Sequence, residues 1–176
     1  MLILILALLG TAMLLMRRDQ ALALAEQLPG RSVALCSAGI AMELLGLAAG
    51  GAIGHGFVVL GIGALIAASW PLRQWRGGWL LILGLTLNGA AMALHGRMPM
   101  PPEVAAEVGL AHQLGTLLAG SKDIVAAGWA ANWLGDRLIM AIPFAHYTIV
   151  WSVGDLFIVG GICRASLGQV HHARYT

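Results

Sequence analysis

Apolar positions along the chain gather into five segments that are separated by polar or charged stretches. The segments cover residues 1–16, 32–53, 56–72, 79–94 and 148–163. A helix of about 16 residues spans roughly 24 Å, slightly less than the ~30 Å hydrocarbon core of a bilayer. The pattern predicts an all-α polytopic bundle of about five transmembrane helices, with residues 1–176 forming a single transmembrane domain.

Composition agrees with a membrane protein. Apolar residues make up 59% of the chain and charged residues only 10%, whereas soluble domains carry about 25% charged residues. The mean hydropathy is +0.84. The net charge of +2 is small, and no basic stripe is interleaved with aromatic residues. Membrane lipids are therefore the expected surroundings, and nucleic acid is not an expected partner.

The long segment between the fourth and fifth spans, residues 95–147, predicts an amphipathic or re-entrant part outside the cytoplasm. Its apolar residues first recur at helical spacing, at Val104, Val108, Ala111, Leu114 and Leu118. This spacing predicts an amphipathic helix on the membrane surface. Ser121 is expected to cap a second helix, in which Trp129 and Trp133 share one face and anchor it at the interface. The sequence leaves open whether the two helices lie on the surface or dip into the bilayer.

The arginines between the spans predict the orientation. Seven of them fall on one side of the membrane if five helices alternate: Arg17, Arg18, Arg31, Arg73, Arg76, Arg164 and Arg174. Because cytoplasmic loops are enriched in Lys and Arg, that side is expected to be the cytoplasm. The N-terminus then lies outside, the C-terminus lies in the cytoplasm, and the long segment lies on the outer side.

One carboxylate stands inside the last apolar segment, where WSVGDLFIVGGIC contains Asp155 as its single charge. An ionised acid at a helix centre in hydrocarbon costs about 2.5–3.5 kcal/mol on insertion scales. One hypothesis is that Asp136 approaches it and forms a catalytic dyad that shares a proton, as in aspartyl hydrolases. The alternative is that Asp136 pairs with Arg137, while Asp155 is a hydrogen-bonded packing residue near Ser152.

Other polar residues extend this candidate site. Asn88 lies near the outer third of the fourth span, where it must find hydrogen-bond partners. It would hold a substrate backbone or fix Asp155, or it would serve only to join helices. Together with Ser152 and Arg137 it forms the expected substrate-binding set. Glu43 in the second span has a structural or a functional role, and the sequence leaves both open. No metal or organic cofactor is expected.

Three stretches resemble motifs of signal peptidase II, the lipoprotein signal peptidase. They are Asn88-Gly89-Ala90-Ala91-Met92, Asn132-Trp133-Leu134-Gly135-Asp136-Arg137 and Trp151-Ser152-Val153-Gly154-Asp155. The resemblance implies that Asp155 is one catalytic aspartate. The family's Val-Asp-Phe motif is missing, so a second catalytic aspartate exists only if Asp136 takes that role. Ser152 also replaces an asparagine of the family.

A second resemblance is to an uncharacterised family of bacterial membrane proteins, domain of unknown function 5317. Three motifs match it in order and without insertions: Gly96-Arg97-Met98-Pro99-Met100, Leu134-Gly135-Asp136 and Ser152-Val153-Gly154-Asp155. This resemblance implies a protein of the bacterial inner membrane and supplies no known activity.

Three functions remain open at this point. The first is a hydrolase similar to signal peptidase II that cleaves a lipid-embedded peptide. The second is a non-enzymatic accessory or scaffold subunit of a larger membrane complex. The third is a small transporter or lipid-binding protein in which Glu43 and Asp155 are proton sites within the membrane.

Overall fold

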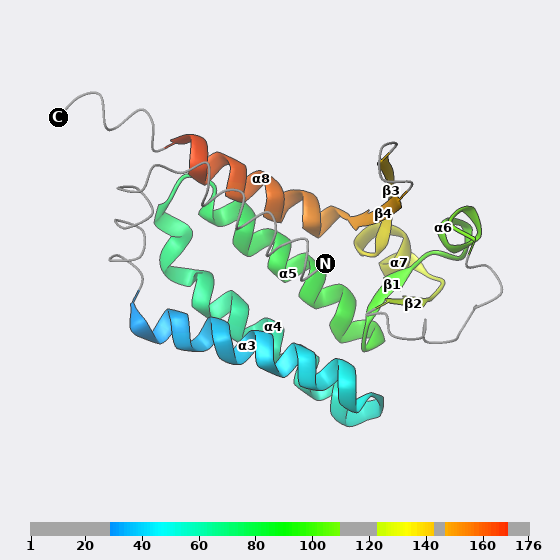
Figure 1. Ribbon diagram of the computed structural model, residues 1–176, viewed down its shortest axis with the longest axis horizontal. Helices are drawn as coiled ribbons and strands as arrows, with labels where there is room; N and C mark the ends of the chain where they lie inside the picture. Colours follow the sequence, from blue (N-terminus) through cyan, green and yellow to red (C-terminus); the bar gives the residue numbers. More distant parts are fainter. Residues whose placement is uncertain (1–28, 110–122, 143–146, 169–176) are drawn as a thin grey trace.

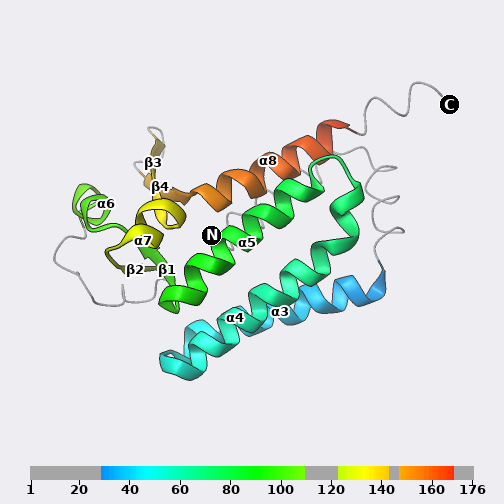
Figure 2. The ribbon, with the colours of Figure 1, turned by 180° about the vertical axis from the view of Figure 1, so that it is seen from behind.

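A computed structural model describes residues 29–109, 123–142 and 147–168, and it is mostly helical (Figure 1). Its long helices are α3 (Gly30–Ala49), α4 (Gly51–Ser69), α5 (Gly78–His95) and α8 (Val153–Gly168), and the short 3-10 helix η1 (Trp70–Gln74) continues α4. Figures 1 and 2 show α3 lying along α4 and α8 lying along α5. The smaller elements gather at one end of these helices.

Three of the helical segments are long and apolar enough to cross a membrane. They are Gly30–Ala49, Gly51–Gln74 and Gly78–His95, with 20, 24 and 18 residues. At 1.5 Å per residue these lengths match a hydrocarbon core of about 30 Å. The fourth expected span, residues 79–94, is confirmed as a helix, since α5 covers it completely and extends one residue beyond each end. The first expected span, residues 1–16, lies outside the described residues.

The predicted start of the last span, residues 148–163, is wrong. The chain forms strand β4 (Tyr147–Ser152) before it enters α8, which then continues to Gly168. Tyr147-Thr148-Ile149-Val150-Trp151 is rich in β-branched and aromatic residues, which favour a strand. With 16 residues, α8 is also shorter than the three candidate spans.

The second and third expected spans meet at a different turn from the one predicted. The expected spans, residues 32–53 and 56–72, leave residues 54–55 for the turn, but α3 ends at Ala49 and α4 begins at Gly51. Gly50 and Gly51 both have positive φ angles, 62° and 57°. L residues rarely adopt this conformation, so the two glycines allow the sharp reversal that joins the helices.

Glycines allow both helix pairs to pack closely. In the first pair, a Cβ on Gly39 would lie 2.8 Å from the carbonyl oxygen of Gly61, and a Cβ on Gly46 would lie 2.6 Å from that of Gly54. Each helix therefore carries two glycines seven residues apart on the contact face. Small residues at such positions let apolar helices approach backbone to backbone.

The pair α5 and α8 repeats this antiparallel arrangement. Gly84 faces Gly154, and Gly77, the residue before α5, faces Gly161, so the glycines on each side are again seven positions apart. A side chain at any of these four positions would overlap the opposite backbone. The contacts also fix the direction of α8, so that its first turn lies near the middle and C-terminal half of α5.

The smaller elements form what we call the cap, residues 98–107 and 123–152 as far as they are described. Its elements are β1 (Met98–Met100), α6 (Pro102–Glu107), β2 (Asp123–Val125), α7 (Trp129–Leu134), β3 (Asp136–Ile142) and β4. β1 pairs with β2 in parallel, and β3 pairs with β4 as an antiparallel hairpin. The expectation of an all-α fold is therefore wrong for the cap, which contains two small sheets.

The two helices expected in the long outer segment can be compared with the structure only in part, because Ala111, Leu114 and Leu118 lie outside the described residues. Within the described residues, the amphipathic helix is limited to α6, where Val104 is buried. The helix expected after Ser121 begins instead as β2, and its helical part is α7. Ser121 itself lies outside the described residues. No part of the described cap forms a re-entrant helix pair.

One apolar core holds the cap on the helices, and a second one lies inside the cap. One core joins Val58 and Ile62 of α4, Ala91 and Met92 of α5, and Met98 of β1. The other lies inside the cap and consists of Met100, Val104, Ala105 and Val125. The first core crosses from bundle to cap, so α5 and β1 are fixed relative to each other, and the end of α5 faces the cap.

Candidate functional site

Three polar side chains meet where α5, β4 and α8 come together, and we call them the polar joint: Asn88, Ser152 and Asp155. Asn88 Nδ2 donates a hydrogen bond to Asp155 Oδ1 at 2.8 Å. Ser152 Oγ donates to Asn88 Oδ1 at 2.9 Å. All three residues are buried, with 2%, 0% and 7% of their surfaces exposed. The sequence predicted that these residues belong to one site, and the structure brings them together.

Ser152 and Asp155 also cap the start of α8. The backbone N–H of Asp155 donates to Ser152 Oγ at 3.0 Å, and the backbone N–H of Ser152 donates to Asp155 Oδ2 at 3.1 Å. This reciprocal pattern is that of a capping box, in which two residues three apart satisfy the free N–H groups of a helix start. The carboxylate also lies in the first turn, where the helix dipole favours a negative charge.

Asp155 is therefore not an isolated acid inside a span. Each of its oxygens accepts a hydrogen bond, one from another helix and one from its own cap. The hydrogen bond to Ser152 that the packing alternative required is present. The spacing Ser-x-x-Asp is itself a signal for a helix that begins at Val153, and the sequence analysis missed it.

Gly154 makes room for the contact between the two helices. A Cβ at Gly154 would overlap the side-chain oxygen of Asn88, and it would lie 2.8 Å from the carbonyl oxygen of Gly84. Because Gly154 lies between Ser152 and Asp155, only a residue without a side chain allows Asn88 to reach both. Gly154 is thus part of the site, although sequence reasoning did not select it.

Asp136 and Arg137 lie in different surroundings next to the polar joint. In the β3–β4 hairpin, Asp136 lies opposite Ser152, and only 2% of its surface is exposed. Arg137 is exposed: its Nη1 donates to the carbonyl oxygen of Asn132, and its guanidinium lies 5.9 Å from the centre of the Trp133 ring. The structure thus brings Asp136 next to the polar joint and places Arg137 on the cap surface.

The described residues contain no group of three or more His, Cys, Asp or Glu side chains that could hold a metal ion. Glu43, the other acid within a span, lies in the middle of α3, and its side chain is next to Gly61 of α4. It belongs to the other helix pair and is not part of the polar joint.

Comparison with known proteins identifies the family. The model of a family of unknown function, DUF5317, matches residues 33–167. The chain belongs to this family. No curated protein and no solved structure matches the sequence. The resemblance to signal peptidase II finds no support in these comparisons.

The three DUF5317 motifs of the sequence meet around the polar joint. Ser152-Val153-Gly154-Asp155 supplies the cap of α8. Gly135 of the second motif packs against Pro99 of the first, since a Cβ at Gly135 would overlap the carbonyl oxygen of Pro99. Met98 and Pro99 are fully buried beneath this contact.

In this DUF5317 protein the motifs therefore form one connection between bundle and cap. The first motif leads from α5 into β1, the second leads from α7 into β3, and the third leads from β4 into α8. Each motif lies where the chain passes between two elements. Close backbone packing explains Gly135, Gly154 and Pro99, and the positive φ angle at the end of α5 explains Gly96. Capping and hydrogen bonding explain Ser152 and Asp155.

Proposed function

We propose that this DUF5317 protein is a non-enzymatic scaffold of the bacterial inner membrane, which presents its cap to a partner in a larger membrane complex. The observation that carries the proposal is the burial and hydrogen bonding of the Asp155 carboxylate. Its carboxylate is buried, and both oxygens accept hydrogen bonds from groups that join α8 to α5 and to its own cap. A carboxylate held in this way positions helices, whereas a catalytic acid must reach a substrate.

The distribution of charge supports an orientation with the cap outside. Arg31, Arg73, Arg76 and Arg164 lie at the ends of α3, α4, α5 and α8 that are remote from the cap. The described cap carries Glu103, Glu107, Asp123 and Asp136 beside Arg137. By the positive-inside rule the arginine-rich end belongs in the cytoplasm. In this arrangement α8 completes the membrane bundle beside α5.

Two Trp and Arg groups support the position of the bilayer between these ends. At the remote end, the Trp70 and Trp79 rings pack edge to face with centres 5.7 Å apart, and Arg73 lies 5.2 Å from the Trp70 ring centre. At the cap, Arg137 lies against Trp133 in the same manner. Tryptophan and arginine favour the headgroup layers on both sides of a membrane.

The proposed docking surface is on the outer strand of the cap. Leu138 and Met140 of β3 are 37% and 50% exposed, and they follow the exposed Arg137 on the same strand. Large apolar side chains on a water-facing part of a protein mark contact surfaces when they lie together. The polar joint holds this hairpin to the bundle through the hydrogen bond from Ser152 Oγ, at the end of β4, to Asn88 Oδ1 of α5.

Photo-crosslinking in cells tests the scaffold proposal. A photoreactive amino acid at Met140 is expected to give a discrete adduct of higher mass, and one at Leu60 on the lipid-facing side of α4 (62% exposed) is expected to give none. The adduct should persist in an Asp155→Asn variant that folds. The proposal fails if Met140 gives no adduct under conditions in which the full-length protein is present in the membrane.

An aspartyl hydrolase remains the second candidate, because Asp136 lies beside Ser152, three residues before Asp155. Its test uses purified protein in lipid nanodiscs with lipid-modified peptides. Cleavage by the native protein that disappears in folded Asp155→Asn and Asp136→Asn variants would favour the hydrolase over the scaffold. The transporter alternative has less support, since Glu43 and Asp155 belong to different helix pairs.

A further inference from the structure

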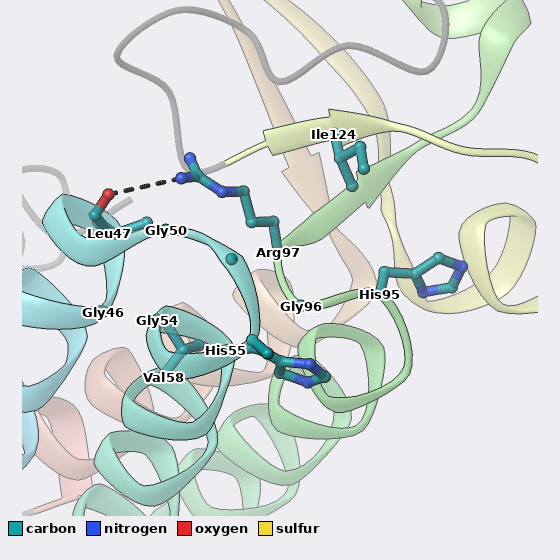
Figure 3. Close-up of a pocket in the computed structure, with 12 residues that line it drawn as sticks. Gly46, Leu47, Gly50, Gly54, His55, Val58, His95, Gly96, Arg97 and Ile124 are labelled. Atoms are coloured by element: carbon teal, nitrogen blue, oxygen red, sulfur yellow. Dashed lines mark hydrogen bonds between the residues drawn. The ribbon is translucent and has the colours of Figure 1, made fainter.

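A second polar site lies on the other side of α5, at the turn between α3 and α4. A cavity of about 340 Å³ opens there between this turn, the Gly96-Arg97 segment that follows α5, and Ile124 of β2 (Figure 3). Its walls include Gly50, Gly51, His55, Gly96 and Arg97. Ligand cavities of about 300–1,000 Å³ are typical of small-molecule sites, so the space is sufficient for a compact headgroup.

The cavity has a cationic wall. Arg97 lines it, and none of the described residues that line it is an acid. The Arg97 guanidinium reaches across the opening, and its Nη2 lies 3.4 Å from the carbonyl oxygen of Leu47 in the last turn of α3. A planar guanidinium at this place has the donor geometry that recognises phosphate oxygens.

The floor of the cavity is equally suited to an anion. The His55 ring is held by a hydrogen bond of 3.0 Å between its Nε2 and the carbonyl oxygen of Ala93. Nothing lies within 4 Å of a Cβ built on Gly50 or Gly51, so the backbone of the turn is open. The backbone N–H groups of the first turn of α4, from Gly51 onward, have no partners within the helix. They add donors to those of Arg97.

The apolar surroundings indicate where the anion comes from. Leu45, near the end of α3, and Ile53, near the start of α4, are 57% and 73% exposed on either side of the turn. Both belong to candidate membrane spans, so the cavity opens at the depth where acyl chains give way to headgroups. The turn that lines the cavity carries these exposed apolar side chains before and after it. The acyl chains of a bound lipid would contact them, whereas a water-soluble anion would not.

We propose that this cavity binds the phosphate group of a membrane phospholipid, with the phosphate against Arg97 and the turn at Gly50-Gly51, and the acyl chains along Leu45 and Ile53. The site is distinct from the polar joint and does not depend on the scaffold proposal. It depends only on the placement of α3, α4 and α5 in a membrane. Bound lipid would join the α3–α4 turn to the cap, which Arg97 connects to α5.

The test measures lipid binding to the purified full-length protein in detergent by native mass spectrometry. Phosphatidylglycerol is compared with a diacylglycerol of the same acyl chains, which lacks the phosphate. Phosphatidylglycerol should bind about tenfold more tightly, because charge-assisted hydrogen bonds are the stronger class. The Arg97→Gln variant should lose this preference, and the Arg137→Gln variant, which removes an arginine from the cap surface, should keep it.

A second pair of variants protects the test against a folding defect in Arg97→Gln. Ala52 is exposed and lines the cavity, so Ala52→Glu adds a negative charge there and Ala52→Gln is its neutral match. The preference should disappear in Ala52→Glu and persist in Ala52→Gln. The proposal would be overturned if the native protein bound the two lipids equally tightly. It would also be overturned if Ala52→Glu and Ala52→Gln showed the same preference for phosphatidylglycerol. If millimolar inorganic phosphate displaced the lipid, the cavity would be a site for free phosphate, and the proposal of a lipid ligand would be overturned.

Discussion

The substitution Gly154→Ala tests the packing of the polar joint without removing any of its hydrogen-bonding groups. A Cβ at this position would overlap Asn88 Oδ1 and the backbone of α5. Asn88 must then move, and it loses its hydrogen bonds to Asp155 and Ser152. Hydrogen bonds to a charged group contribute about 1.5–3 kcal/mol and neutral ones about 0.5–1.5 kcal/mol.

The expected loss is partly offset, because alanine favours a helix over glycine by about 1 kcal/mol. We therefore expect Gly154→Ala to lower the free energy of unfolding by about 1–3.5 kcal/mol, taking both contributions together. In a chain of this size each kcal/mol shifts the melting temperature by about 2–4 °C. The melting temperature in detergent should thus fall by several degrees, which a thermal melt of the purified protein measures.

Gly160→Ala in the same helix is the matched control. Nothing lies within 4 Å of a Cβ at Gly160, so the substitution should leave stability unchanged or raise it slightly through helix propensity. If the two variants melt at the same temperature, Asn88 does not depend on the space at Gly154, and the reasoning about the joint is refuted.

Three further substitutions test other parts of the account. Asp155→Ala should lower the free energy of unfolding by about 1–2 kcal/mol more than Asp155→Asn, because the amide keeps one acceptor oxygen; equal losses in a denaturant titration would contradict this. Gly46→Leu should separate α3 from α4 and lower the free energy of unfolding by about 1–3 kcal/mol or more through overpacking. Gly63 has open space around it, so Gly63→Leu should leave the melting temperature nearly unchanged. Gly135→Ala should push β3 away from Pro99 and speed tryptic cleavage after Arg137; an unchanged cleavage rate would show that this contact does not hold the cap.

The long apolar helices could be predicted because their signal is local and extends over many residues. α5 was placed correctly from its hydropathy alone. The turn at Gly50-Gly51 was missed because glycines inside an apolar run also occur at helix contacts. Their positive φ angles depend on the backbone and leave no trace in hydropathy.

The cap could not be derived in the same way. β1 and β2 contain three residues each, and they pair across more than 20 positions of the sequence. Short strands with distant partners have no periodic pattern. β3 and β4 did carry a signal, the β-branched and aromatic residues before Ser152, but it was outweighed by the apolar run of α8 that follows.

The candidate site could likewise be predicted only in part from the sequence. The grouping of Asn88, Ser152 and Asp155 followed from their being polar residues in apolar segments, which must find partners. Their roles did not follow, because the capping of α8 depends on where that helix begins. The contributions of Gly135 and Gly154 come from distances between backbones, and only the folded arrangement contains them.

A double-mutant cycle between Asn88 and Asp155 tests most directly whether the polar joint connects α5 to α8. The free energy of unfolding is measured for the native protein, for Asn88→Ala, for Asp155→Ala and for the double variant. Residues that share a hydrogen bond give coupling energies of about 0.5–3 kcal/mol, and we expect a value in the upper half of that range for this buried pair. Additive losses, within about 0.5 kcal/mol, would contradict the account.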